Sequence, residues 1–140
     1  MLRVFWDTNL FIYLVEGSAE FGALTIALAE RMKERGDQIY TSTLTLGEVL
    51  IHPERFGRSD LRKEYEEVLS RRATLIPFDK DTARIYSRIQ AQKKIKASDA
   101  IQLACAAQCQ ADLFVTNDDE LTRAVVPEVK FITTLSKCPI

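Results

Sequence analysis

Four acidic side chains stand where a carboxylate needs an explanation. Asp7 and Asp118 each directly follow a short apolar run, whereas Glu48 and Asp99 lie in stretches that otherwise carry core residues. A buried carboxylate is costly unless it is paired, protonated or bound to a cation. Oxygen ligands suit the hard cations Mg²⁺ and Mn²⁺. Two such ions about 4 Å apart can activate a water and stabilise the leaving oxygen of a phosphoryl displacement.

Each of the four acids also has a purely structural explanation. Aspartate is a favoured residue at the start of a helix, and both Asp7 and Asp118 precede a helical pattern. Glu48 and Asp99 could instead form structural salt bridges with arginines. Ser98 is the expected cap of the helix that contains Asp99, which leaves the Asp99 side chain free for another role.

Several other catalytic patterns are missing from the chain. His52 is the only histidine, so acid–base catalysis by a pair of histidines is excluded. It lies four residues after Glu48, on the same helical face, but we interpret it as a partly buried side chain beside Pro53 rather than as a ligand. No Gly-x-x-x-x-Gly-Lys loop and no Gly-x-Ser-x-Gly turn occurs.

The composition is typical of a single globular domain, residues 1–140, with 46% hydrophobic and 28% charged residues. Three cysteines without zinc-ligand spacing predict free thiols and a cytoplasmic location. No apolar run fits a signal peptide or a membrane span, so no membrane association is expected. The net charge of −1 lacks the basic excess typical of nucleic-acid binding, although bound divalent cations would invert the charge of an acidic site.

Short apolar runs alternate with helical periodicity, which favours an α/β fold with a parallel sheet. The expected strands are Arg3–Trp6, Gln38–Thr41, Thr74–Phe78, Asp112–Thr116 and Val129–Ile132. In open parallel sheets, ligands bind beyond the carboxyl ends of the strands, where the winding of the sheet reverses. Asp7 and Asp118 would therefore meet over one site if the first and fourth strands are neighbours.

Helical patterns fill the segments between these strands. The first is expected to turn inward one face formed by Phe21, Leu24, Leu28 and Met32. Gly36 is well placed to end that helix. A loop is expected at Pro53–Ser59 and an irregular tail at Thr133–Ile140.

Three further helices are expected after this loop. One turns Leu61, Tyr65, Val68 and Leu69 inward, and another spans Asp79–Lys93 with its first residue as the cap. The segment Ser98–Gln110 is apolar nearly all round, which predicts a central, buried helix.

Four motifs, taken in order, resemble the PIN-domain family. They are Phe5-Trp-Asp-Thr-Asn9, Thr45-Leu-Gly-Glu48-Val, Ser98-Asp99-Ala100 and Val115-Thr-Asn-Asp118. The chain is similar, over nearly its whole length, to the single-domain VapC-like toxins of prokaryotic toxin–antitoxin pairs. The resemblance implies a three-layer α/β/α sandwich around a parallel five-stranded sheet of order 3-2-1-4-5, in which the first and fourth strands are neighbours.

The resemblance also implies a function: hydrolysis of RNA phosphodiester bonds with Mg²⁺ or Mn²⁺. The family's acidic ligands match this sequence at Asp7, Glu48, Asp99 and Asp118. Its supporting small polar residues match at Thr8, Asn9 and Thr116. A second acid, Asp119, adjoins the last ligand, and the motif favours Asp118 for direct contact. Family members often form homodimers and are usually inhibited by a small antitoxin protein.

Three lysines shortly before Asp99 are candidates for phosphate contact, namely Lys93, Lys94 and Lys96. They equally fit a solvated helix end, where cations interact favourably with the helix dipole. Three other functions stay open: an inactive RNA- or protein-binding module, a structure-specific DNA nuclease, and a phospho-acceptor pair of Asp118 and Asp119. Four intact acids argue against an inactive site, whereas nothing in the sequence identifies a contact to the RNA 2′-hydroxyl.

Overall fold

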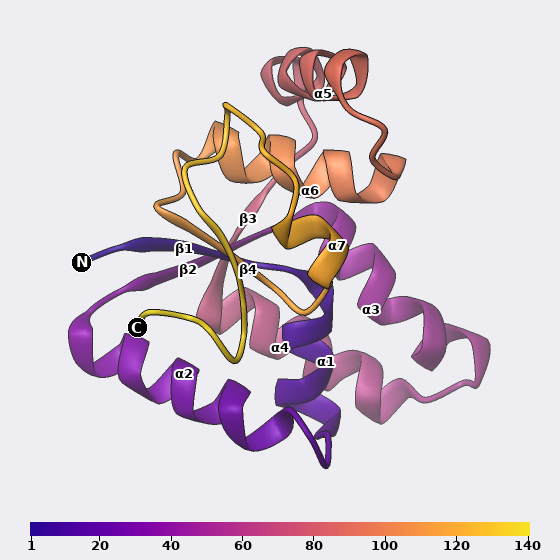
Figure 1. Cartoon of the computed structure of the whole chain (residues 1–140). Coiled ribbons are helices and arrows are strands. Elements are labelled where there is room, and N and C mark those ends of the chain that lie inside the picture. Colours follow the sequence, from indigo (N-terminus) through magenta and orange to yellow (C-terminus); the bar gives the residue numbers. More distant parts are fainter.

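A five-stranded parallel sheet forms the centre of the computed structural model, which describes all 140 residues (Figure 1). The strands are β1 (Arg3–Trp6), β2 (Gln38–Ser42), β3 (Ala73–Ile76), β4 (Leu113–Thr116) and β5 (Ile132–Thr134). Their order in the sheet is 3-2-1-4-5, and every neighbouring pair is parallel. The predicted α/β class and strand order are confirmed.

Helices cover both faces of this sheet. They are α1 (Thr8–Glu16), α2 (Gly22–Arg35), α3 (Thr43–Arg55), α4 (Ser59–Arg72), α5 (Lys80–Gln92), α6 (Ala97–Gln108) and the short α7 (Asp119–Thr122). The first four pack on one face, and α5 and α6 lie over the other (Figure 1). None of the helices combines the length and apolar character that a membrane-spanning segment requires.

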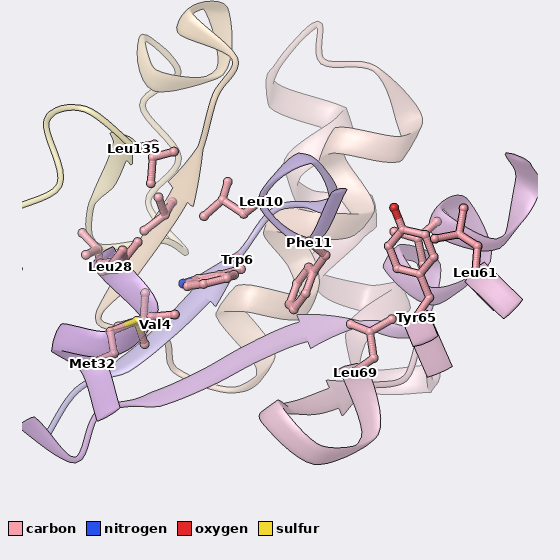
Figure 2. Close-up of a cluster of buried hydrophobic side chains, with 14 residues drawn as sticks. Val4, Trp6, Leu10, Phe11, Leu28, Met32, Leu61, Tyr65, Leu69 and Leu135 are labelled. Carbon is pink, nitrogen blue, oxygen red and sulfur yellow. The ribbon is translucent and has the colours of Figure 1, made fainter. Parts of the chain in front are cut away.

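Each face of the sheet carries its own hydrophobic core. Successive residues of a strand point to opposite faces, so Val4 and Trp6 enter the core beneath α1 to α4 (Figure 2). Phe5 points the other way and stacks on Phe114 of β4, with 5.1 Å between ring centroids, in the core beneath α5 and α6. Burial on both faces explains why β1 and β4 read as continuous apolar runs.

Several local signals in the sequence act as predicted. Gly36 ends α2 with a φ of +76°, and the amide of Asp37 donates to the Met32 carbonyl at 2.8 Å, which satisfies an end carbonyl of the helix. Asp79 caps α5 by accepting from the Thr82 amide at 2.9 Å. The predicted cap by Ser98 is wrong, because α6 already begins at Ala97 and has no side-chain cap.

Two edge strands are displaced from their predicted positions. β3 begins at Ala73 and ends at Ile76, one to two residues earlier than predicted. β5 spans Ile132–Thr134 rather than Val129–Ile132, so the predicted tail starts as a strand. Val129 is instead buried in a turn, where its amide donates to the Val126 carbonyl at 3.0 Å. The apolar residues before β5 therefore pack the core from a loop and not from a strand.

The predicted loop at Pro53–Ser59 is mostly helical. α3 continues to Arg55 with Pro53 in its last turn, where a proline removes only one hydrogen bond of the helix. The break is limited to the three residues before Ser59, which include Gly57 at a φ of +64°. His52 is exposed and packs on Phe56, so its predicted partial burial is also wrong.

The buried face of α2 is rotated from the predicted one. Leu28 and Met32 are buried as expected, but Leu24 is 43% exposed. Thr25 takes the inward position instead, and its hydroxyl donates to the Phe21 carbonyl at 2.8 Å. A threonine can face the core here because its hydroxyl is hydrogen-bonded within its own helix.

This rotation of α2 gives a stability prediction for two leucines of one helix. Leu28→Ala should lower the free energy of unfolding by about 2–5 kcal/mol, because it removes a fully buried side chain from the core beneath α1 to α4. Leu24→Ala should change it by no more than about 0.5 kcal/mol, as surface substitutions do. Urea unfolding of both variants measures the difference. Equal losses would contradict the observed orientation of α2.

Candidate active site

The β1–β4 pairing brings the first and last acidic segments together. Trp6 is in register with Val115, and the Asp7 amide donates to the Val115 carbonyl at 2.9 Å. Both strands therefore end at the same edge of the sheet. There the Thr116 hydroxyl donates to Asp7 Oδ2 at 2.7 Å and accepts from the Asp118 amide at 3.1 Å. Asp7 and the loop that carries Asp118 are thus fixed against one another.

Two helices complete this group of acids. Glu48 lies in the second turn of α3, which follows β2, and its Oε1 accepts from the Thr8 hydroxyl at 2.6 Å. Asp99 lies in the first turn of α6. The four acids share one cleft of about 160 Å³ at the carboxyl edge of the sheet, which we call the acid cleft. Its lining residues are Asp7, Thr8, Asn9, Glu48, Ser98, Asp99, Gln102 and Asp118.

The lining of the cleft distinguishes between the two candidates for the last acidic ligand. Asp118 lines it, whereas Asp119 is exposed in α7 and lies outside it. Thr116 is fully buried beneath the cleft and acts through its hydrogen bond to Asp7. The predicted group therefore comes together, apart from Asp119 and the three lysines.

The structural explanations of the four acids hold for only two of them. Asp7 caps α1 by accepting from the Thr8 amide at 2.8 Å, and Asp118 caps α7 by accepting from the Glu120 amide at 2.9 Å. Neither Glu48 nor Asp99 forms a salt bridge with any arginine or lysine. A carboxylate has two oxygens with about four acceptor sites, so capping leaves Asp7 and Asp118 able to bind a further partner.

The acid cleft carries negative charge that the protein does not neutralise. Burial raises the pKa of Asp7, and the charge of Asp118 adds to this effect; hydrogen bonds from Thr116 and Thr8 oppose it. Burial also raises the pKa of Asp99, followed by repulsion from Asp7, Asp118 and Glu48, whereas Lys96 acts in the opposite direction. Mutual repulsion of carboxylates is the electrostatic state that a bound divalent cation relieves.

The side chains of the acid cleft fit a hard cation by their chemistry. Its donors include four carboxylates with hydroxyl and amide groups, and no hydrophobic residue or cation lines it. As placed, no three of the acids converge on one point at which an ion could be held. Glu48 is turned to Thr8 and Asp118 to the Glu120 amide, so shared coordination requires these side chains to rotate.

Gln102 is a residue of the site that the sequence did not single out. Its side chain is 2% exposed, and its Nε2 donates to the hydroxyls of Thr8 at 3.1 Å and Thr45 at 2.8 Å. Its Oε1 accepts from the Ser42 hydroxyl. Because Thr8 in turn donates to Glu48, Gln102 orients an acid that it does not touch. The sequence did contain one indication of this role: Gln102 is a polar amide one helical turn after Asp99, in a stretch predicted to be buried.

The three predicted lysines lie beside the acid cleft and not in it. Lys93, Lys94 and Lys96 line an adjacent hollow, to which Asp99 and Asp118 also contribute. Lys93 directly follows α5, and Lys96 directly precedes α6. Their position next to two of the acids keeps phosphate contact as a prediction.

Comparisons with known proteins agree with this architecture. VapBC2 from Rickettsia felis, solved bound to a promoter DNA fragment, is 16% identical with a TM-score of 0.75, covering 95% of this chain and 98% of that chain. A toxin–antitoxin complex from Klebsiella pneumoniae is 21% identical with a TM-score of 0.71, covering 94% and 97%. FitAB bound to IR36 DNA is 19% identical with a TM-score of 0.72, covering 98% of both chains.

At these identities the solved structures show a shared fold. No curated protein sequence matches the chain. The family model described as PIN domain matches residues 4–126, which include all four acids of the acid cleft, β1 from its second residue, and β2 to β4. The match over most of the chain, together with the sheet order 3-2-1-4-5, shows that the chain belongs to the PIN-domain family.

Proposed function

We propose that the chain is an endoribonuclease that hydrolyses RNA phosphodiester bonds with Mg²⁺ or Mn²⁺. The observation that carries this proposal is the acid cleft, which four carboxylates from four segments of the chain line and which no lysine or arginine lines. Metal-dependent phosphoryl transfer needs oxygen ligands on a rigid scaffold, and rotation of Glu48 and Asp118 toward the cleft would bring these acids together. The placement beyond the carboxyl ends of β1 and β4 is the usual location of sites in open parallel sheets.

Seven residues in or beside the cleft have a defined task in this proposal. Asp7, Glu48, Asp99 and Asp118 hold the ions. Thr116 orients Asp7, and Gln102 orients Glu48 through Thr8. The bound ions would supply an activated water and stabilise the leaving oxygen. Attack of water at phosphorus then leaves a 5′-phosphate on one product and a 3′-hydroxyl on the other.

Cleavage of a labelled RNA tests the activity. The purified chain should cut single-stranded RNA in millimolar Mg²⁺ or Mn²⁺ and stop in excess EDTA. Asp7→Asn, Asp99→Asn and Asp118→Asn should each lower the rate by about 100-fold or more, as loss of one charge-stabilising group does elsewhere. Asp119→Asn is the matched control and should keep most activity, because Asp119 lies outside the cleft.

Two results would contradict parts of this assignment. Undiminished cleavage in EDTA would rule out the metal mechanism. If Asp118→Asn stays active and Asp119→Asn does not, the ligand is Asp119 and the assignment of Asp118 is wrong. A single-stranded DNA of the same sequence serves as the second substrate, and cleavage of that DNA alone would favour the DNA-nuclease alternative.

Metal binding should also appear as a change in stability. A ligand at a hundredfold excess over its Kd stabilises the native state by about 2.7 kcal/mol, which is a Tm rise on the order of 8 °C for a domain of this size. The pKa of Asp7 and of Asp99 is raised in the metal-free fold. The folded state therefore binds protons more tightly than the unfolded state, and the cost of the ionised acids is relieved as pH falls through these raised values.

The rise in Tm should consequently be large at pH 7.5 and small at pH 5, where protons compete with metal for the carboxylates. Asp7→Asn should lose most of the rise and should melt above the metal-free wild type at pH 7.5, because one buried charge is removed. Asp81→Asn, in an exposed ion pair with Arg84, is the control and should respond like wild type. Superimposable curves with and without Mn²⁺ at both pH values would mean that the acids form no metal site.

We further propose that the chain is the toxin of a toxin–antitoxin pair and acts in the cytoplasm as a homodimer. The similar solved structures include VapBC complexes and a complex described as toxin–antitoxin, which supports a small protein partner. The cysteines Cys105, Cys109 and Cys138 are free thiols, the state that a reducing compartment maintains.

Growth of a bacterial host tests the toxin role. Induction of the wild-type chain should arrest growth, and co-expression of the small protein encoded next to it should restore growth. Asp7→Asn, produced at the same level, should be harmless because the acid cleft loses a ligand. Normal growth during induction of a chain that cuts RNA in vitro would remove the toxin role and leave the nuclease in place.

A further inference from the structure

A hollow of about 430 Å³ opens directly beside the acid cleft and shares Asp99 and Asp118 with it. One wall is the linker between α5 and α6, and the other is α7 with the segment after it. We call this hollow the basic groove, because four cations line it: Lys93, Lys94, Lys96 and Arg123. Its volume lies within the usual range of ligand-binding pockets.

The cations of the basic groove form no direct ion pair within the protein, although Lys96 lies close enough to Asp99 to favour its ionised form. Six ion pairs occur elsewhere in the molecule, and none of them involves these four side chains. None of them donates a side-chain hydrogen bond either, and all four residues are exposed. The acid cleft next to the groove contains no cation at all. Three acids, Asp99, Asp118 and Glu120, also line the groove, so its four cations leave a formal excess of one positive charge there, whereas the acid cleft is lined by acids alone among charged residues.

Apolar side chains also line the basic groove. Ile95, Leu121, Ala124 and Val125 contribute to the groove between the cations. Val125 is 75% exposed, so its side chain is open to contact from solution at the groove. Cations beside an apolar surface match a nucleotide, whose phosphate needs charge and whose base needs a flat apolar contact.

We propose that the basic groove binds the nucleotide next to the scissile phosphate of a single-stranded RNA, a proposal that rests on the function proposed above. The phosphate lies against Lys96 and Arg123, and the base covers Ile95 and Val125. The strand must be single because a paired base is stacked in its helix and cannot offer its face to a protein. Arg123, which the sequence did not single out, becomes a substrate-binding residue.

Binding of a fluorescein-labelled RNA, followed by anisotropy, tests this assignment. All variants carry Asp7→Asn so that the RNA is not cut. Each phosphate contact on a single strand contributes about 0.7 to the slope of log K against log salt. Lys96→Gln/Arg123→Gln should therefore reduce that slope by about 1.4 and weaken binding at low salt. Val125→Ser should weaken binding at every salt concentration without changing the slope.

A double variant of equal charge at the opposite edge of the sheet provides the control. Lys33 lies in the last turn of α2 and Arg72 is the last residue of α4; both line another hollow and lack an ion-pair partner. Lys33→Gln/Arg72→Gln should leave both the affinity and the slope unchanged. A blunt RNA duplex of the same sequence should bind at least about tenfold more weakly than the single strand.

Three results would overturn the groove. They are an unchanged salt slope in Lys96→Gln/Arg123→Gln, equal binding of the duplex, and competition by polyglutamate at the concentration at which unlabelled RNA competes. The last would assign the groove to an acidic peptide. Cleavage by the wild-type chain is measured separately: cleavage together with an unchanged slope would reject the groove alone. Groove-dependent binding without cleavage would support the groove and reject the nuclease.

Discussion

The parallel pairing of β1 with β4 is the constraint on which the rest of the molecule depends. It places the reversal of sheet winding between these two strands, because β1 also pairs with β2 and β4 with β5. It buries both strands on two faces, which makes them the centre of both cores. It also sets Asp7 and Thr116 side by side, so that the first acid is held by a strand from the far end of the chain. Core and site thus share one set of backbone hydrogen bonds.

Electrostatics divides the functional edge of the sheet into two adjacent regions. The acid cleft concentrates carboxylates whose mutual repulsion, opposed by Lys96 at Asp99, is relieved further by protons or by cations from solution. The basic groove next to it holds unpaired cations against an apolar surface. The net charge of −1 conceals this separation, because opposite local excesses cancel in the total. Binding of a polyanion by such a protein depends on local arrangement and cannot be judged from total charge.

The structure could be predicted from the sequence where a residue acts through its neighbours in the chain. It could not be predicted where contacts between distant residues determine orientation or role. Gly36 ends a helix by its own backbone freedom, and strand ends next to acids predicted the location of the site. The inward face of α2 could not be predicted, because the space left by the sheet and the neighbouring helices decides whether Leu24 or Thr25 is buried. Val129 was predicted to lie in a strand for a similar reason: its apolar side chain shows that it is buried but not whether a strand or a loop carries it. Gln102 acquires its role from partners 60 and 94 residues away, which no local pattern records.

The wide spacing of the four acids along the chain has a consequence for biosynthesis. Asp7 is made well before its partner strand β4, because Thr116, whose hydroxyl donates to it, follows 109 residues later in the chain. Until β4 is inserted, the central strand lacks one neighbour and the cleft lacks one wall. A chain that ends before β4 therefore lacks Asp118 and cannot form the complete cleft. Completion of the cleft and insertion of a central strand are thus a single step of folding.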